Sequence, residues 1–375
     1  MTIPFNLSKF ADYLNASGNA NPLVASDQTN TSTGSLGLPY GTTAQRPASP
    51  AVGYTRINTT TDVLEVYYNN TWNTIYTFVS GTQNAIFGFG YNSSIVAISI
   101  TNLVSSTGVV ASDTTGVGTA RSGLAATTYG GNKAIFGYGS NTSGINVSMT
   151  NLVSTTGVVA SDTTGVGTQR TNLAAAQYGT DKGVFAYGNT GIAPYVSSIT
   201  NYVSNTGVVA SDTFAASPER DRLASASYGS DKAIFGFGVT SSGNSNAINL
   251  LSNTGVFASS TSGIGTARQQ LAAAKYGMDK AIFGFGVVGS TYYSLTNLVS
   301  NTGVLATDTA GVGTARSGLA ASNYGGNKAI FGFGNDGTNI VSTTNLVSNT
   351  GVVATNTTTV ATAKLALAAA GYSLT

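Results

Sequence analysis

The chain has 375 residues, of which 8% are charged, against roughly 25% in an average globular domain, and its formal net charge is +2. It contains no Cys and no His, which excludes disulfide scaffolds, thiolate metal sites and His-based acid–base chemistry. Without a basic cluster we expect no nucleic acid as partner, and without a run of about 18 apolar residues we expect no membrane span. Abundant Val, Thr, Tyr and Phe favour strands, and 47 Gly residues supply turns, so we expect an all-β protein without a cofactor.

The first predicted element is a short amphipathic helix over residues 6–14, with apolar side chains at helical spacing and Asn6 as its cap. A helix this short is marginal by itself, so we expect it to dock on its own chain or on a partner. Residues 16–37 are rich in Asn, Ser, Thr and Gly and indicate an extended linker. Together they form a predicted anchor over residues 1–37. Its contact surface would be Phe5, Leu7, Phe10 and Leu14.

Residues 38–78 are predicted to form a small β-hairpin adaptor module. The stretches 53–58 and 63–68 would pair over the turn 59–62, and the single Trp of the chain, Trp72, would pack on them. A module of this size has no room for a large core. We therefore expect it to lean on the rest of the chain or on sister chains.

This segment resembles a small module of bacteriophage tail fibres and other appendage proteins. The resemblance covers residues 38–75 and rests on four motifs: Gly-Thr-Thr-Ala-Gln-Arg-Pro from residue 41, Arg-Ile-Asn from residue 56, Leu-Glu-Val-Tyr from residue 64, and Trp72. It implies a structural protein on the capsid or tail surface of a virion, bound to other virion proteins through residues 1–78. By analogy with phage fibres it also implies a homo-oligomer, such as a trimer.

Residues 79–375 contain six copies of one repeat. The block Ala-Ile-Phe-Gly-Phe-Gly at residue 85 returns with small changes at residues 134, 183, 233, 281 and 329. Each copy predicts four short strands: a (Leu-Ala-Ala-Ala), b (the block), c (Asn-Leu-Val-Ser) and d (Val-Val-Ala-Ser, as at residues 109–112). We expect Phe87 and Phe89 to alternate onto one face and fill the core between copies. Four antiparallel strands per repeat of about 50 residues indicate a six-bladed β-propeller.

The C-terminus supplies an extra strand a, residues 367–372, which follows the sixth copy. The first copy begins without one. We expect this C-terminal strand to pair beside residues 85–90 and close the propeller, which removes its open edges.

The repeats resemble kelch repeats over residues 80–375. In each copy a basic residue lies three before a Leu, and that Leu lies five before a Tyr. The Gly-x-Gly spacing and the lack of a repeated Trp depart from kelch, so the resemblance implies a kelch-like architecture. The basic side chains could bind an anionic sugar or phosphate together, or they could bond local carbonyls and tie neighbouring blades. Because every copy has one, we interpret them as structural: Arg121, Arg170, Arg220, Arg268, Arg316 and Lys364.

A second recurring position follows strand d. In four copies it is Asp (Asp113, Asp162, Asp212 and Asp308), and in the other two it is the uncharged Ser260 and Asn356, whereas Ca²⁺ needs clustered oxygen ligands. We therefore assign no metal site and expect turns in which each Asp bonds its own backbone. No catalytic site is assigned either, although Asp221, Asp231 and Asp336 remain open as carboxyls of a glycosidase.

The b–c loops break the repeat and lie on the same face as the d–a loops. Tyr, Ser, Gly and Asn are abundant in them, as in adaptable recognition loops. The charged stretch 218–222, which contains Arg222, lies on the same face and could join them. Neutral variation or contacts with neighbouring virion chains would give the same pattern. The candidate recognition residues are Tyr91, Asn92, Asn141, Asn189, Tyr195, Asn244, Tyr292, Tyr293, Asn335 and Asp336.

Three functional hypotheses follow. The first is a non-enzymatic tail or head fibre that presents its propeller to a host-surface glycan or receptor. The second is a virion decoration or adaptor protein that uses the propeller as a protein–protein platform. The third is an envelope polysaccharide depolymerase.

Overall fold

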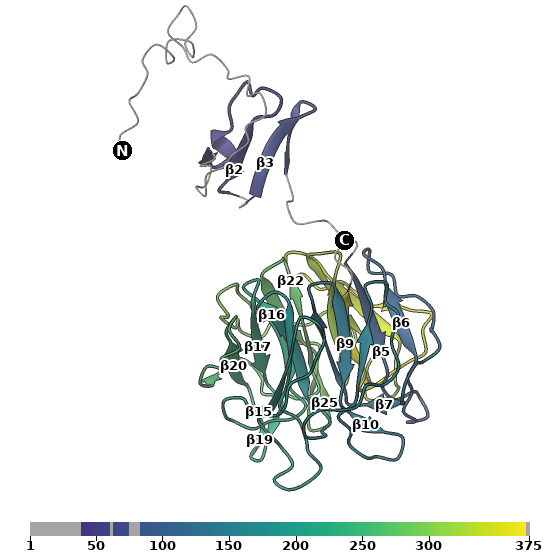
Figure 1. The fold of residues 1–375 in the computed structure, drawn as a ribbon. Helices are drawn as coiled ribbons and strands as arrows, with labels where there is room; N and C mark the ends of the chain where they lie inside the picture. Colours follow the sequence, from purple (N-terminus) through teal and green to yellow (C-terminus); the bar gives the residue numbers. More distant parts are fainter. Residues whose placement is uncertain (1–38, 61–62, 75–82, 373–375) are drawn as a thin grey trace, which may run out of the picture. The chain divides into compact units, whose positions relative to one another are not determined.

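A computed structural model of the chain describes residues 39–60, 63–74 and 83–372 (Figure 1). The predicted helix over residues 6–14 lies outside the described residues, as do Phe5, Leu7, Phe10 and Leu14. The structure is all-β, and none of its described helices is long and apolar enough to span a membrane. The chain divides into two compact units, Met1–Tyr76 and Thr77–Thr375.

The smaller unit is a four-stranded sheet of order β1-β2-β3-β4. The predicted hairpin is present: β2 (Thr55–Asn58) pairs antiparallel with β3 (Val63–Tyr68). β1 (Tyr40–Gly41) runs parallel to β2, a 3₁₀ helix (Thr43–Gln45) follows it, and β4 (Thr71–Thr74) completes the sheet. Trp72 packs on the hairpin, with its ring centroid 5.5 Å from that of Tyr67.

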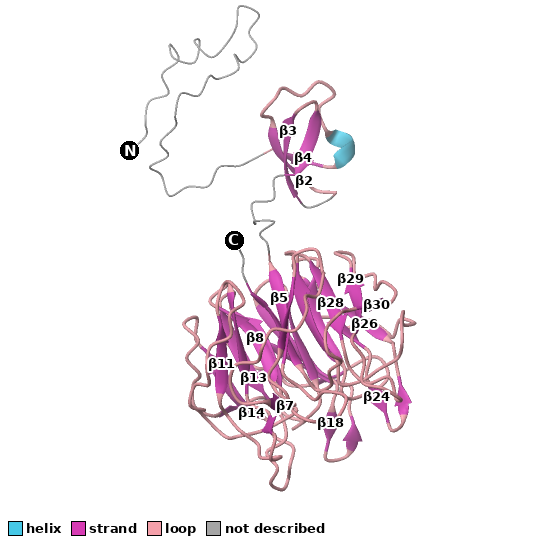
Figure 2. Cartoon of the chain, turned by 90° about the vertical axis from the view of Figure 1, so that its right-hand side faces the viewer, coloured by secondary structure: helices cyan, strands magenta, loops and turns pink. Residues whose placement is uncertain are grey.

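In the described part of the larger unit, six antiparallel sheets of three or four strands share one strand order, and Figure 2 shows strands of several of them beside one another. In each, a first strand pairs with a central strand, the central strand with a third, and three sheets add a two-residue fourth. Numbered along the chain, sheets 1 to 6 are β31-β5-β6 (Ala368–Tyr372, Asn84–Gly88, Thr101–Val104), β8-β9-β11 (Ala125–Tyr129, Lys133–Gly137, Thr150–Val153), β12-β13-β14-β15 (Ala174–Tyr178, Lys182–Ala186, Ile199–Val203, Thr213–Phe214), β16-β17-β20-β21 (Ala224–Tyr228, Lys232–Gly236, Ala247–Leu251, Thr261–Ser262), β22-β23-β26 (Ala272–Tyr276, Lys280–Gly284, Thr296–Val299) and β27-β28-β29-β30 (Ala320–Tyr324, Lys328–Gly332, Thr343–Val347, Thr357–Thr358).

Short two-residue strands pair outside these sheets, next to the loops that connect them. They are β7 (Arg121–Ser122) with β10 (Ser140–Asn141), β18 (Val239–Thr240) with β19 (Gly243–Asn244), and β24 (Val287–Val288) with β25 (Thr291–Tyr292).

Sheet 1 joins the two ends of the unit. All five residues of the C-terminal strand β31 pair with β5, with Ala370 opposite Ile86, as the sequence predicted. The first strands also adjoin one another between sheets: β8 contacts β12, β12 contacts β16, β16 contacts β22, β22 contacts β27, β27 contacts β31, and β31 contacts β8. Ala-rich first strands allow this close approach because their side chains are small.

The prediction that Phe87 and Phe89 share one face is wrong. Phe87 packs against Phe333 of sheet 6, whereas Phe89 packs against Phe136 of sheet 2, each with ring centroids 5.1 Å apart. The strand ends at Gly88, and Phe89 has a left-handed backbone with φ of 63°. Extended alternation therefore stops one residue earlier, and the two rings fill the cores on opposite sides of sheet 1.

The predicted strand d at residues 109–112 is also wrong as a regular strand. The segment beside β6 is paired with it at two points, Val110 with Val104 and Thr114 with Thr101. Between these points the chain advances by four residues in the segment but by only three in β6. This count is that of a β-bulge. The side chain of Asn102 spans the bulge and donates to the Ala111 carbonyl (3.1 Å). Backbone bonds continue on both sides, from Ala111 N–H to the Leu103 carbonyl (2.8 Å) and from Thr114 N–H to the Thr101 carbonyl (2.8 Å), and the Asn102 side chain bonds the carbonyl between them.

Candidate functional site

The repeated basic residues are buried inside the larger unit. The side chains of Arg121, Arg170, Arg220, Arg268, Arg316 and Lys364 are all fully buried. In sheet 5, Arg268 donates from Nε to the Phe285 carbonyl (2.7 Å) and from Nη2 to Asn297 Oδ1 (2.7 Å). Its guanidinium also lies 4.6 Å from the ring centroid of Phe237 in sheet 4. The residues thus tie neighbouring sheets and present no charge to a ligand.

Burial changes the acidity of these cations. It lowers the pKa of Arg268 to about 10, although the charge of Asp308 partly offsets the effect. Burial lowers the pKa of Lys364 to about 8, again partly offset, by Asp113. Lys364 replaces Arg in sheet 1, where its Nζ donates to Asn102 Oδ1 and lies 4.8 Å from the ring centroid of Phe333.

The recurring Asp residues hold the loops that precede the first strands. Asp162 accepts from Asn151 Nδ2 (2.9 Å) and from both N and Oγ1 of Thr119 (2.9 and 2.7 Å). Asp113, Asp212 and Asp308 have the same kinds of partner. The prediction that each Asp bonds its own backbone is therefore wrong. The carboxylate instead accepts hydrogen bonds from the Asn side chain that spans the bulge and from a Thr of a distant loop.

The same contacts set the ionisation of Asp162. Burial by itself would raise its pKa, but the hydrogen bonds from Thr119 and Asn151 and the charge of Arg121 outweigh burial and lower the pKa. Asp162 is thus a charged structural acceptor. Among the described residues no group of three or more Asp, Glu, Cys or His is placed to hold a metal ion.

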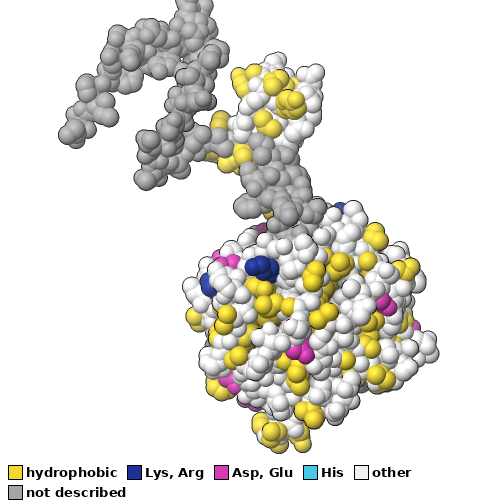
Figure 3. Space-filling view, turned by 45° about the vertical axis from the view of Figure 1, so that its right-hand side comes forward, with side chains coloured by type: hydrophobic (Ala, Val, Ile, Leu, Met, Phe, Trp, Pro, Cys, Tyr) yellow, Lys and Arg dark blue, Asp and Glu magenta, His cyan; other side chains and the backbone are white. Residues whose placement is uncertain are grey.

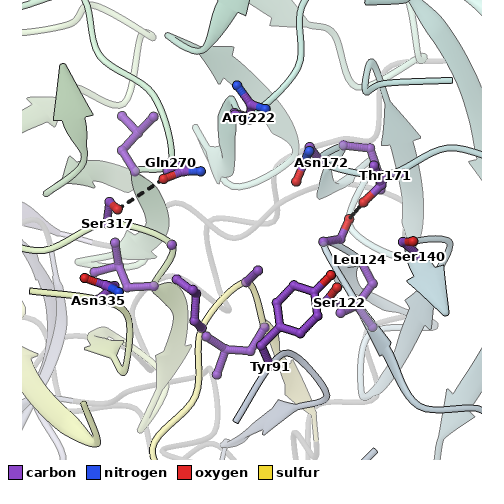
Figure 4. A pocket seen from close by; sticks show the side chains of 18 of the residues that line it. Tyr91, Ser122, Leu124, Ser140, Thr171, Asn172, Arg222, Gln270, Ser317 and Asn335 are labelled. Atoms are coloured by element: carbon purple, nitrogen blue, oxygen red, sulfur yellow. Dashed lines mark hydrogen bonds between the residues drawn. The ribbon is translucent and has the colours of Figure 1, made fainter. Parts of the chain in front are cut away.

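A pocket of about 600 Å³ opens at the end of the sheets where the first strands begin (Figure 4). Residues from all six sheets line it. They come from the segment between each buried basic residue and the following first strand, and from the loops after the central strands of sheets 1, 2, 5 and 6. The first group includes Ser122, Gly123, Thr171, Asn172, Arg222, Gln270, Ser317, Gly318 and Ala366, and the second includes Tyr91, Ser140, Gly144, Asn146, Tyr292 and Asn335.

A circuit of backbone hydrogen bonds surrounds this pocket. Each of six residues donates its N–H to the carbonyl of the equivalent residue in the preceding sheet, over 2.7 to 2.9 Å: Gly123 to Ala366, Asn172 to Gly123, Arg222 to Asn172, Gln270 to Arg222, Gly318 to Gln270, and Ala366 to Gly318. All six have positive φ, between 51° and 63°. This conformation suits Gly and Asn, and costs other residues of order 1 kcal/mol each. We call this set the backbone circuit.

The side chains of the backbone circuit divide into two arcs. Asn172, Arg222 and Gln270 are polar and belong to consecutive sheets 3, 4 and 5, whereas Gly123, Gly318 and Ala366 are small. Figure 4 shows Arg222 on one side of the pocket and Tyr91, from the loop of sheet 1, on the opposite side. Six similar sheets therefore surround a pocket in which the members of the backbone circuit differ from one side to the other, although Ser122, Ser317 and Asn335 add polar groups elsewhere.

The predicted recognition residues have two fates. Tyr91, Tyr292 and Asn335 line the pocket. Among the others, Asn92 and Asn141 accept from backbone N–H groups two and four residues later, and Asp336 accepts from Thr338 and Asn339. These three side chains stabilise their own turns. Asn189, Tyr195, Asn244 and Tyr293 do not line the pocket either, and Tyr195 is exposed.

Sequence reasoning missed Asn172 and Gln270, and it included Arg222 only as part of the charged stretch 218–222 that could join the recognition loops. The signal was the second residue after each repeated basic residue: it reads Gly, Asn, Arg, Gln, Gly, Ala along the six copies, although the residue that follows it is Leu in every copy. This variation could be interpreted as a binding site only once the structure showed that the position faces the pocket.

The three carboxyls left open for catalysis have separate partners. Asp221 accepts from Asn189 Nδ2 (3.1 Å), Asp231 pairs with Lys232 (2.8 Å), and Asp336 bonds its own turn. The described residues that line the pocket include no Asp or Glu. The pair of facing carboxyls that a glycosidase uses is not assembled there.

The sequence matches no protein-family model and no curated protein.

Proposed function

We propose that residues 83–372 form a six-bladed, kelch-like β-propeller closed by β31. Three observations support this architecture: the pairing of β31 with β5, the contacts that link each first strand to two others, and the backbone circuit through all six sheets. Aromatic pairs support it as well, because a pair such as Tyr138 with Phe185 lies between each two neighbouring sheets. Each blade thus packs on two others.

We propose further that the chain is a non-enzymatic structural protein of a phage virion, a tail or head fibre that recognises the host surface. The observation that carries recognition is the pocket, where irregular side chains gather on an otherwise regular scaffold. Variable positions on a rigid repeat are where binding function is expected. The virion context rests on the sequence of residues 38–75, which folds as a small sheet with Glu65 buried between Arg46 and Arg56.

The surface charge fits recognition of a small ligand better than binding to nucleic acid. On the face shown in Figure 3, Lys and Arg side chains are few and separated by uncharged groups. A nucleic acid would require a continuous basic track.

A decoration or adaptor protein is the alternative. It is favoured by Val109, Val158, Val208, Val256, Val304 and Val352, which occupy the same position in the six sheets and are 65 to 67% exposed. Apolar side chains repeated around the molecule would suit contacts with neighbouring virion proteins.

A reconstruction of the virion that contains this chain tests both. Host recognition predicts that the pocket end of the larger unit faces outward from the capsid or tail. A pocket end buried between virion proteins would support the adaptor instead, and absence of the chain from the particle would reject both proposals.

A further inference from the structure

We propose that the pocket binds an acidic sugar, one that carries a carboxylate or a phosphate, with its anionic group on Arg222. The proposal rests on the proposed host-recognition function and specifies the ligand class of that site. It also moves the anion-binding role from the six repeated basic residues, which are buried, to a cation that the repeat does not contain.

Charge is the first argument. Arg222 is the single charged side chain among the described residues that line the pocket. In the described part of the chain no carboxylate lies within 4.0 Å of its guanidinium. The one hydrogen bond described for this guanidinium runs from Nη1 to Gln269 Oε1 (3.1 Å). A guanidinium has five N–H donors, and its planar fork suits carboxylate and phosphate oxygens.

Rigidity is the second argument. The backbone of Arg222 is fixed on both sides, because its N–H donates to the Asn172 carbonyl (2.8 Å) and its carbonyl accepts from Gln270 (2.9 Å). The following Leu223 is buried. The root of the side chain is therefore placed before a ligand arrives, which reduces the entropy lost on binding.

The neighbouring side chains fit the hydroxyl groups of a sugar. Gln270 Oε1 accepts from Ser317 Oγ (3.1 Å), an arrangement that directs the amide NH₂ of Gln270 to other acceptors. Asn146 Nδ2 donates to the Asn189 carbonyl (3.1 Å), which leaves Asn146 Oδ1 as an acceptor. Tyr91 supplies an aromatic ring across from Arg222 (Figure 4). A pocket of about 600 Å³ is within the range of small-molecule sites.

The test uses sugars that differ only in charge. Isothermal titration calorimetry or ligand-observed NMR with the full chain would compare galacturonic acid and galactose 6-phosphate with galactose, and glucuronic acid and glucose 6-phosphate with glucose. We expect at least one acid to bind about tenfold more tightly than its neutral counterpart, since that is the effect of one good charge-assisted contact. The two acids of each set distinguish carboxylate from phosphate recognition. High salt should weaken binding of the acidic sugar and leave binding of the neutral sugar unchanged.

Two variants locate the effect. Arg222→Gln removes the charge but introduces the residue that sheet 5 carries at the equivalent position, so the backbone circuit should persist and the melting temperature should stay unchanged. It should reduce binding of the acid to the level of the neutral sugar. Lys328→Gln is the control, because it removes one exposed positive charge from the first residue of β28, at the end of the sheets away from the pocket. It should leave binding unchanged.

The failures are distinguishable. If no acid binds better than its neutral counterpart, or if Arg222→Gln binds the acid as well as the native chain, the inference is overturned. If, after either of these results, a labelled chain still attaches to host cells, the proposed host-recognition function stands without the acidic-sugar ligand. If the chain attaches to no host cell, both the host-recognition function and the acidic-sugar inference are rejected.

Discussion

At the scale of single residues, the larger unit depends on cations buried between its sheets. Each is held by carbonyls, by an Asn side chain or by an aromatic ring of the neighbouring sheet, as Arg268 is by Phe285, Asn297 and Phe237. A buried cation without such partners would be strongly destabilising. Although the chain has few charged residues overall, each of the six sheets therefore has one buried cation with a structural role.

Arg268→Met should destabilise the larger unit by about 3–5 kcal/mol, because the Phe285 carbonyl and Asn297 Oδ1 lose their buried donor. Urea unfolding followed by Tyr fluorescence would measure the loss. Arg222→Gln, at the partly exposed backbone circuit, should change stability by no more than about 0.5 kcal/mol. A loss below about 1 kcal/mol in Arg268→Met would contradict the structural role.

Lys364 should make stability depend on pH. Its folded pKa of about 8 lies below the usual 10.5, so between pH 8 and 10.5 the unfolded chain binds a proton that the folded chain has released. Stability from this group therefore rises with pH through that window. In Lys364→Arg the side chain stays protonated, so the rise should disappear. Melting temperatures of both proteins, measured from pH 7 to 9.5, would show this difference. Parallel plots of melting temperature against pH for the two proteins would refute the prediction.

At the scale of elements, β31 is the strand that joins the C-terminus to sheet 1. Its five residues pair with β5, and Ala368, Ala370 and Tyr372 contribute to the core shared with sheet 2. Without it, β5 would present an unpaired edge, and Ile86 and Phe89 would lose apolar partners. Its contribution is therefore both hydrogen bonding and burial.

Deletion of residues 365–375 should abolish cooperative folding of the larger unit. It removes β31 and also Ala366, one of the six members of the backbone circuit. Circular dichroism during heating would show no cooperative transition at the temperature of the native chain. Deletion of residues 373–375 alone is the matched control, since it leaves β31 entire. An unchanged melting temperature in the longer deletion would rule out the proposed closure.

At the scale of the whole molecule, regularity and irregularity have separate roles. The sheets repeat their buried cations, bulges and aromatic pairs, and this repetition supports the proposed propeller. The pocket departs from that symmetry, because three consecutive sheets place Asn172, Arg222 and Gln270 on one arc of the backbone circuit. These three side chains make the pocket asymmetric within a regular scaffold. The proposed recognition of an acidic sugar is therefore a property of the assembled sheets and of no single repeat.

The sequence alone determined the all-β class, the six repeats, the hairpin of residues 53–68 and the pairing of the C-terminal strand with the first copy. These features depend on local spacing and turn chemistry, which a chain carries in its residue order. The structural interpretation of Arg268 and its equivalents also followed from their recurrence.

Only the tertiary structure decided which side chains meet. It placed Phe87 and Phe89 in different cores, because the left-handed backbone at Phe89 ends the alternation. It linked Asp162 to Thr119, 43 residues away, where local bonding had been expected. It brought Asn172, Arg222 and Gln270 to one pocket, since the backbone circuit joins residues about 50 positions apart. Contacts between sheets are set by packing across repeats, and the spacing within one repeat contains no record of them.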